Sequence, residues 1–315
     1  MKDFIKNVFA NIVAILLIGA VLLGIMIMIF VVSAMSGDQK PFVENNSVLT
    51  INFKGNILDS YTEKEESIFD FGQNKDVLLL DVVNAINNAK KDEKIKGISI
   101  EVDNLPAGIT QVDDIRAAIE DFKKSGKFVY AYGNNMSQGS YYLASVADKL
   151  YLNPVGMVEL KGLSTEVTFL KDFAAKYGIG VDVIRHGKFK AAVEPFIRND
   201  ISPENKEQLS TLLNDIWGNI STKIKASRKL DDTTFKTAVD SLYGFMPELV
   251  VKNKLADQLL QKSEYENLIK KQLKLKSDEK INRISVNKYI KSLDEEKSSD
   301  NKIAVLYAAG EIFNG

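Results

Sequence analysis

Two lysines lie close together in an apolar part of the sequence. Residues 186–196 read HGKFKAAVEPF, so Lys188 and Lys190 have phenylalanine, alanine and valine as neighbours. A lysine amine held in an apolar pocket loses solvation of its charged form, so its pKa falls and it can accept a proton from a nucleophile near neutral pH. The same pattern arises when a lysine stem packs and its ammonium reaches water. Spacing does not choose between these roles or between the two lysines, which share one face of an extended backbone.

A lysine base requires a nucleophile, and residues 135–145 provide three candidates. The segment reads NMSQGSYYLAS and places Ser137, Ser140 and Ser145 at a predicted strand-to-helix turn. Amides at a helix N-terminus can stabilise an oxyanion, which favours a nucleophile there. Ser137 is also a suitable N-cap residue with no further role. The Pro-Gly turn NLPAGIT at 104–110 has amides that could line a site or simply form a turn.

Composition excludes several other kinds of site. The 315 residues contain no cysteine, so disulfides, thiolate metal sites and cysteine nucleophiles are excluded. His186 is the one histidine, so a His-rich metal site lacks ligands and a Ser-His-Asp triad would depend on it alone. The formal net charge of −1 offers no basic field for nucleic acid. No phosphate-binding glycine motif follows a predicted strand, and we expect no cofactor and no bound metal.

Strands and helices alternate through the first half of the chain after residue 46. The pattern predicts strands at 47–55, 95–103, 127–133 and 149–154, and helices at 77–92, 111–126 and 137–148. Such alternation favours right-handed βαβ units with parallel strands, an α/β fold. Asp113 and Asp114 are expected in the first turn of their helix, without a catalytic role.

The second half of the chain is predicted to be mainly helical. We expect short strands at 163–167 and 181–187 on either side of a helix at 168–178. Ser202 is a good N-cap with Pro203 at the first helical position, so a helix begins there and continues towards Ser227. Shorter helices are expected at 231–244 and 246–257, followed by a Lys-rich amphipathic segment at 263–281 and a charged linker at 292–301.

The first 46 residues are expected to anchor the chain in a membrane. Residues 8–35 carry no charge, and about 20 apolar residues suffice to span a bilayer. The apolar core of a cleaved signal peptide is shorter, about 7–15 residues, which disfavours cleavage after the small residues 32–34. Lys2 and Lys6 precede the span, and positive flanks stay in the cytoplasm. We therefore expect a single-pass protein of the inner (cytoplasmic) membrane whose residues after 36 face outwards, into the periplasm where the cell has an outer membrane.

The end of the chain resembles the start of the predicted sheet. Residues 302–315, KIAVLYAAGEIFNG, align with residues 47–59, SVLTINFKGNILD, because both are an apolar strand leading to a glycine turn. Two short strands can also look alike by chance. If the repeat is real, residues 47–301 form the first copy of a domain with a helical extension, and residues 302–315 begin a second copy that stops at Gly315.

Three segments resemble one known family. MSQGSYYLASVADKLYLNP, HGKFKAAVEPFIRNDISPE and KGISIEVDNLPAG, after a single membrane span, are similar to the amino-terminal half of the long, tandem-repeat form of signal peptide peptidase A, also called protease IV. KAAVEPFIRNDISPE is the most specific part. The resemblance covers essentially the whole chain and implies a ClpP/crotonase-like spiral of βαβ units. It also implies homo-oligomers that assemble into a bowl.

The resemblance also implies a catalytic mechanism. The family cleaves peptide bonds with a Ser–Lys dyad, and its base is the lysine directly before the Ala-Val-Glu-Pro-Phe segment, which is Lys190 here. Lys188 falls at a position that need not be lysine. The family nucleophile lies in the second repeat, beyond residue 315, and Gly139 occupies the equivalent position of the first repeat. Neither Ser137 nor Ser140 aligns with it, and 104–110 is a degenerate form of the Pro-Gly-Gly turn that helps to form the oxyanion hole.

Two functions follow from these observations. The first is a membrane-anchored serine endopeptidase that degrades signal-peptide remnants, with residues 1–315 alone inactive because they contain the base and not the nucleophile. The alternative is a non-catalytic, membrane-tethered module that scaffolds partners or binds peptides. A crotonase-type acyl-CoA enzyme is disfavoured by the membrane span.

Overall fold

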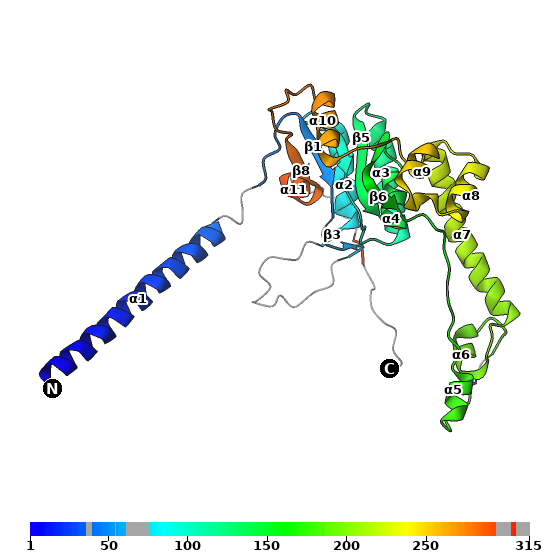
Figure 1. The fold of residues 1–315 in the computed structure, drawn as a ribbon, viewed down its shortest axis with the longest axis horizontal. Helices are drawn as coiled ribbons and strands as arrows, with labels where there is room; N and C mark the ends of the chain where they lie inside the picture. Colours follow the sequence, from blue (N-terminus) through cyan, green and yellow to red (C-terminus); the bar gives the residue numbers. More distant parts are fainter. Residues whose placement is uncertain (36–39, 54, 61–75, 185, 294–303, 307–315) are drawn as a thin grey trace. The chain divides into compact units, whose positions relative to one another are not determined.

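The computed structural model describes residues 1–35, 40–53, 55–60, 76–184, 186–293 and 304–306. Contacts divide the chain into two units, Met1–Phe42 and Val43–Gly315. The expected second-copy segment at 302–315 lies almost entirely outside the described residues. Figure 1 shows the elements of both units along the chain.

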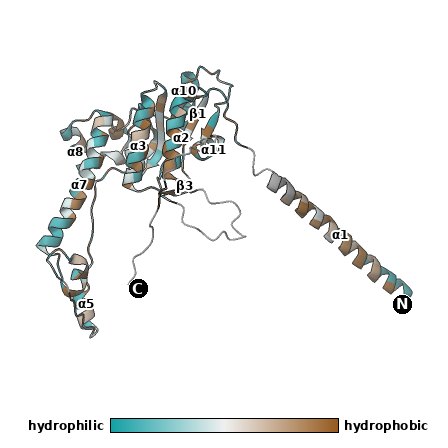
Figure 2. Ribbon diagram, turned by 180° about the vertical axis from the view of Figure 1, so that it is seen from behind, coloured by the Kyte–Doolittle hydropathy of each residue, from teal (hydrophilic) through white to brown (hydrophobic). Residues whose placement is uncertain are grey.

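The first unit is one long apolar helix, α1 (Lys2–Met35). Its segment Lys2–Phe30 contains an 18-residue window with a mean hydropathy of 3.2, and its length and composition suffice to cross a membrane. Figure 2 colours this helix brown beyond its hydrophilic first turns. Apolar side chains such as Phe9, Leu16 and Met28 are exposed on several sides, which is typical of a helix that lipid can surround.

The second unit is built on a six-stranded parallel sheet. Its strands lie in the order β7-β6-β5-β4-β1-β8, and each neighbouring pair is parallel. The strands are β1 (Ser47–Ile51), β4 (Ile95–Ile100), β5 (Phe128–Met136), β6 (Lys149–Val158), β7 (Gln258–Leu259) and β8 (Arg283–Ser285). From β1 to β7 the chain adds each new strand to the same edge. The expected α/β class with successive βαβ units is therefore confirmed.

Helices cover both faces of this sheet. Alternate residues of β5 enter two different cores: Val129 and Ala131 join the larger one, and Phe128 and Tyr132 the smaller. The larger core is closed by α2 (Leu79–Lys91), α3 (Ile109–Lys123), α4 (Gln138–Ala144) and α11 (Val286–Ser292), and the smaller by α10 (Lys262–Gln272). Burial on both faces explains the continuous apolar runs of the central strands. A second sheet is the short parallel pair β2 (Ile57–Leu58) and β3 (Val77–Leu78).

A helical extension follows β6. It contains α5 (Lys171–Lys176), the 3₁₀ turn η1 (Ala191–Val193), α6 (Glu194–Ile197), α7 (Pro203–Arg228), α8 (Asp232–Asp240), the 3₁₀ turn η2 (Tyr243–Phe245) and α9 (Pro247–Lys252). Ile220 and Ile224 near the end of α7 are buried in the larger core. Gly244 lies so close to β6 that a Cβ there would be 2.1 Å from the Val158 carbonyl oxygen, which explains the glycine. The extension is thus anchored on the sheet by the C-terminal half of α7 and by η2.

The two strands expected at 163–167 and 181–187 are wrong. Residues 161–170 and the described residues 179–184 form no regular structure. A strand needs a neighbour that accepts its backbone hydrogen bonds, and no pairing in the described chain involves these residues. Val181 and Ile184 are exposed instead. Their apolar, β-branched side chains produced a strand pattern without a sheet to join.

Candidate active site

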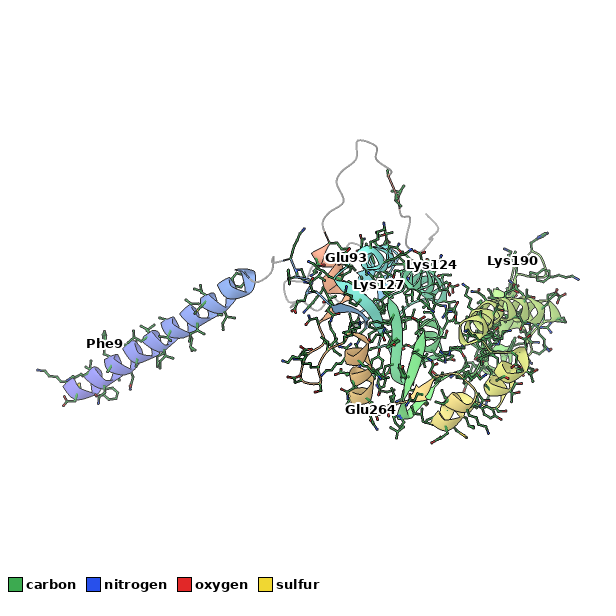
Figure 3. The ribbon with its side chains drawn as sticks, turned by 90° about the horizontal axis from the view of Figure 1, so that it is seen from above. Phe9, Glu93, Lys124, Lys127, Lys190 and Glu264 are labelled. Carbon is green, nitrogen blue, oxygen red and sulfur yellow. The ribbon has the colours of Figure 1, made fainter. Side chains whose placement is uncertain are left out.

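Lys190 lies in a turn at the far end of the helical extension. Figure 1 shows α5 and α6 beside the N-terminal end of α7, and Figure 3 labels Lys190 on this extension. Lys190 is the residue before η1, and Gly187 supplies a left-handed backbone three residues earlier, with φ +92°. The lysine side chain is exposed and borders a cavity of about 610 Å³ with Ile184, Phe189 and Leu209. The expected apolar surroundings are therefore present on one side of Lys190, and solvent is on the other.

Lys188 has a different environment. Its side chain is 82% exposed, and its Nζ lies 3.9 Å from a carboxylate oxygen of Glu204 in the first turn of α7. It does not line the cavity beside Lys190. The structure thus separates the two lysines, which the sequence pattern alone could not do.

The turn that carries Lys190 is held by short contacts to its neighbours. The Leu170 amide donates to the Pro195 carbonyl oxygen at 2.6 Å. The Asn199 amide group donates to Asp172 of α5 at 2.9 Å. These bonds hold α5 against α6, the short helix that follows the turn of Lys190.

The same end of the extension exposes an apolar surface. Its large exposed side chains are Phe173, Tyr177, Ile179, Ile184, Phe189, Phe196 and Leu212. Single exposed apolar residues are ordinary, but a group within one segment is typical of an interaction surface. We call this group the apolar arm.

The three serines of residues 137–145 have structural roles. Ser137 caps α4: its Oγ accepts from the Ser140 amide at 3.3 Å and shares a hydrogen bond of 3.0 Å with the Ser140 hydroxyl. Ser140 and Ser145 are fully buried, and the Ser145 hydroxyl donates to the Tyr142 carbonyl oxygen. Among the described residues, no hydrogen bond or ion pair joins any of them to Lys190. The capping interpretation of Ser137 is confirmed.

Gly139, which the family resemblance is expected to align with the nucleophile, lies in the first turn of α4. A Cβ added there would meet no atom within 4 Å, and its φ is not left-handed. No local strain or crowding therefore requires a glycine at this position. A serine could be accommodated without moving the backbone.

We expect Gly139→Ser to fold normally and to be slightly more stable. Serine loses less backbone freedom than glycine on entering a helix, which is worth roughly 0.5 kcal/mol. The free energy of unfolding from urea titration of the purified chain measures this. The variant should gain no peptidase activity, since Lys190 lies on the extension and not beside α4. A loss of more than about 1 kcal/mol would contradict the open environment seen at Gly139.

The Pro-Gly turn at 104–110 uses its amides internally. The Gly108 amide donates to the Gln111 side chain at 2.9 Å, and the Ala107 amide donates to the Leu105 carbonyl oxygen at 2.9 Å. The Pro106 carbonyl oxygen accepts from Ile57 of β2. In this chain the segment behaves as a structural turn that starts α3.

A buried polar joint, which the sequence did not indicate, connects the sheet unit to α7. Arg116 of α3 is 1% exposed and donates to the Tyr142 carbonyl oxygen, to Ser145 at 2.8 Å and to Ser227 of α7 at 2.9 Å. Arg116 thereby joins α3, the end of α4 and the last turn of α7.

Asp113 adds a second set of contacts to this joint. It lies in the second turn of α3, not the first as expected, because α3 begins at Ile109. It accepts from Tyr142 and from Asn219 at 2.9 Å, and Lys223 lies 2.9 Å away. Burial raises the pKa of Asp113, but the hydrogen bonds from Tyr142, Lys223 and Asn219 outweigh it, so the pKa lies below its ordinary value. The carboxylate is therefore charged at neutral pH and holds α7 in place.

The sequence was compared with known protein families and proteins. Residues 121–276 match the model of peptidase family S49. The chain carries a peptidase family S49 domain. It is 30% identical to Protease 4 of Haemophilus influenzae, in an alignment that covers 95% of this chain and 52% of that protein. It is 35% identical to Protease 4 of Salmonella typhi, in an alignment that covers 78% of this chain and 41% of that protein. The chain thus spans about half the length of the curated relatives it matches.

Further similar proteins were also found. The chloroplastic serine protease SPPA of Arabidopsis thaliana is 36% identical over 56% of this chain and 25% of that one. A solved membrane-bound stomatin-specific protease superposes with a TM-score of 0.39 at 13% identity, over 71% of this chain and 84% of that one.

Proposed function

We propose that this chain is the base-bearing half of a membrane-anchored serine endopeptidase that degrades signal-peptide remnants. Lys190 acts as general base, and the nucleophilic serine lies beyond residue 315. Lys190 accepts the proton of that serine as the serine attacks the peptide carbonyl carbon, and then donates the proton to the leaving amine. A hydrolytic water regenerates the serine by the same route. The observation that carries the proposal is Lys190 beside a partly apolar cavity in an S49 chain.

The division of the dyad is supported by what the chain offers near α4. Gly139 carries no side chain, and the neighbouring serines are used as cap and buried structural groups. The exposed side of Lys190 leaves room for another part of the protein to approach. A serine brought to that side would exclude water from the amine.

The apolar arm supports assembly with another polypeptide surface. We propose that the arm packs against the second repeat or against a neighbouring copy, so that the active enzyme is a homo-oligomer. Burial of such side chains stabilises an interface by about 25 cal/mol per Å² of apolar surface. The membrane anchor α1 is proposed to hold the assembly at the cytoplasmic membrane with the catalytic part outside, close to apolar peptides left by signal cleavage.

The alternative, a non-catalytic peptide-binding or scaffolding module, has one specific observation in its favour. The family resemblance places Gly139 where the family nucleophile aligns, and Ser137, Ser140 and Ser145 have structural hydrogen-bond partners around α4. The two functions differ in what the full-length protein does to a peptide bond. A scaffold binds the peptide and releases it intact.

The test uses a fluorophosphonate probe, which labels activated serines, and a synthetic apolar signal peptide. The full-length protein in detergent should be labelled once per chain and should cleave the peptide. Residues 1–315 prepared alone serve as the matched control and should neither be labelled nor cleave. Mass spectrometry of the labelled peptide locates the serine. If the full-length protein binds the peptide but shows neither labelling nor cleavage, the scaffolding function replaces the enzymatic one.

A further inference from the structure

The segment that carries Lys190 contains a fully buried carboxylate that the mechanism does not yet use. Glu194 follows Lys190 by four residues and is 0% exposed. Burying a carboxylate is unfavourable unless hydrogen bonds replace its hydration. A buried glutamate in an otherwise exposed turn therefore indicates a specific structural demand at this point.

The bonds of Glu194 go to the beginning of α7. One carboxylate oxygen accepts from the Asn205 side chain at 3.1 Å and from the Ser202 amide at 3.3 Å. Ser202 is the N-cap of α7, and its hydroxyl accepts from the Asn205 amide at 3.1 Å. A negative charge is favoured at a helix N-terminus, where the backbone amides point outwards. Glu194 therefore completes the cap of a 26-residue helix from a different part of the chain.

The charge state of Glu194 agrees with this geometry. Burial raises the pKa of Glu194, but hydrogen bonds from Ser202 and Asn205 and the nearby Arg198 outweigh burial, so the pKa lies below its ordinary value. The group is ionised at neutral pH. It then acts as a strong acceptor, since hydrogen bonds to ionised groups are roughly twice as strong as neutral ones.

One short turn connects Glu194 to Lys190. Lys190 precedes η1, the Glu194 amide donates to the Ala191 carbonyl oxygen, and the Arg198 amide donates to the Glu194 carbonyl oxygen. The backbone between the two side chains is thus a continuous set of tight turns with little freedom. Asn205, a hydrogen-bond partner of Glu194, also lines the cavity beside Lys190. The position of Lys190 relative to α7 is consequently set at Glu194.

We infer that Glu194 is a positioning residue for the peptidase reaction, which ties the turn of Lys190 to the N-terminus of α7 and so fixes the direction in which the amine points. This inference rests on the proposed role of Lys190 as the base. Glu194 does not itself touch the substrate. A misplacement of a catalytic group by about 1 Å can lower a rate by about 10²-fold, so a positioning residue has a measurable effect on kcat.

The test compares Glu194→Ala, Glu194→Gln, Glu207→Gln and Lys190→Ala in the full-length protein. Glu207 is an exposed glutamate in the second turn of α7, and it is the matched control. We expect Glu194→Ala to lower kcat by about 10²-fold with KM within about twofold of the wild type. Glu194→Gln keeps the size and one acceptor oxygen, so it should retain more activity than Glu194→Ala. Glu207→Gln should be indistinguishable from the wild type.

Hydrogen exchange of the same variants separates positioning from general loss of structure. Glu194→Ala should speed amide exchange in residues 190–206 and leave exchange in β4, β5 and α3 unchanged. If both Glu194 variants have wild-type kcat while Lys190→Ala is inactive, the positioning role is wrong and the proposed function stands. If Lys190→Ala is itself fully active, the proposed base is wrong. Should Glu194→Ala fail to fold, Glu194→Gln with wild-type kcat and exchange would still overturn the inference.

Discussion

Replacing Lys190 with alanine in the full-length protein should lower kcat for peptide hydrolysis by about 10²–10⁴-fold. General acid–base groups contribute factors of this size, because the serine hydroxyl is a weak nucleophile until its proton is removed. Lys190→Ala removes the amine and keeps the side chains of Glu194 and of Ser202, the N-cap of α7. KM should change little, because the amine acts on the reacting atoms and not on the remote parts of the peptide. Steady-state kinetics with a fluorogenic apolar peptide measure both constants.

Lys188→Ala is the matched control for this experiment. Lys188 has the same side chain two residues away, but it is 82% exposed and does not line the cavity. We expect kcat within about twofold of the wild type, because an exposed ion pair such as Lys188–Glu204 contributes about 0–1 kcal/mol. Equal loss of activity in both variants would mean that the segment needs positive charge in general. If Lys190→Ala had the kcat of the wild type, Lys190 would not be the general base.

Arg116→Ala should have the largest effect on stability, about 3–5 kcal/mol of the free energy of unfolding. The substitution removes a buried cation and the hydrogen bonds that it donates to the Tyr142 carbonyl oxygen and to the hydroxyls of Ser145 and Ser227; the Tyr142 carbonyl oxygen keeps only the donor from Ser145. It also removes the guanidinium from the face of the Tyr142 ring, 4.5 Å from its centre. Chemical denaturation followed by circular dichroism measures the loss. Because the joint anchors α7, hydrogen exchange in residues 216–228 should increase most.

Arg198→Ala is the control for Arg116. Its guanidinium pairs with Asp200 two residues away, and that aspartate is exposed. A local surface pair of this kind should account for no more than about 1 kcal/mol. If Arg116→Ala were as mild as Arg198→Ala, the buried joint would not be what holds the extension to the sheet.

The parts of the fold with strong local signals could be predicted from the sequence. The apolar runs of β1, β4, β5 and β6 correspond to strands buried on both faces, and Ser202-Pro203 marks the start of α7 correctly. β7 and β8 were missed because they contain two and three residues and lie in charged surroundings. β7 forms only because it pairs with β6, and β8 only because it pairs with β1. Such pairing between distant segments leaves no local pattern in the sequence.

The candidate site shows the same limit. Lys190 was chosen over Lys188 as the candidate base only through the family resemblance, because the surroundings of a side chain depend on surfaces that sequence spacing does not define. The burial of Glu194 was not predicted, because a glutamate next to a proline is typical of an exposed turn. Its burial arises from the N-terminus of α7, which attracts a carboxylate once the helix exists. The contacts of Arg116 and Asp113 could not be predicted either, because their partners lie on α7 and at or near the end of α4, far away in the sequence.

The brevity of β7 and β8 has a consequence for how the sheet can pair with other molecules. Long, flat outer strands offer unpaired amides and carbonyls to other molecules and promote aggregation. Here β5 is paired on both sides, and the two outer strands contain two and three residues, one of them carrying Arg283. These outer strands are too short to pair with a long strand of another molecule, and we expect contacts between copies of this chain to depend on side chains instead.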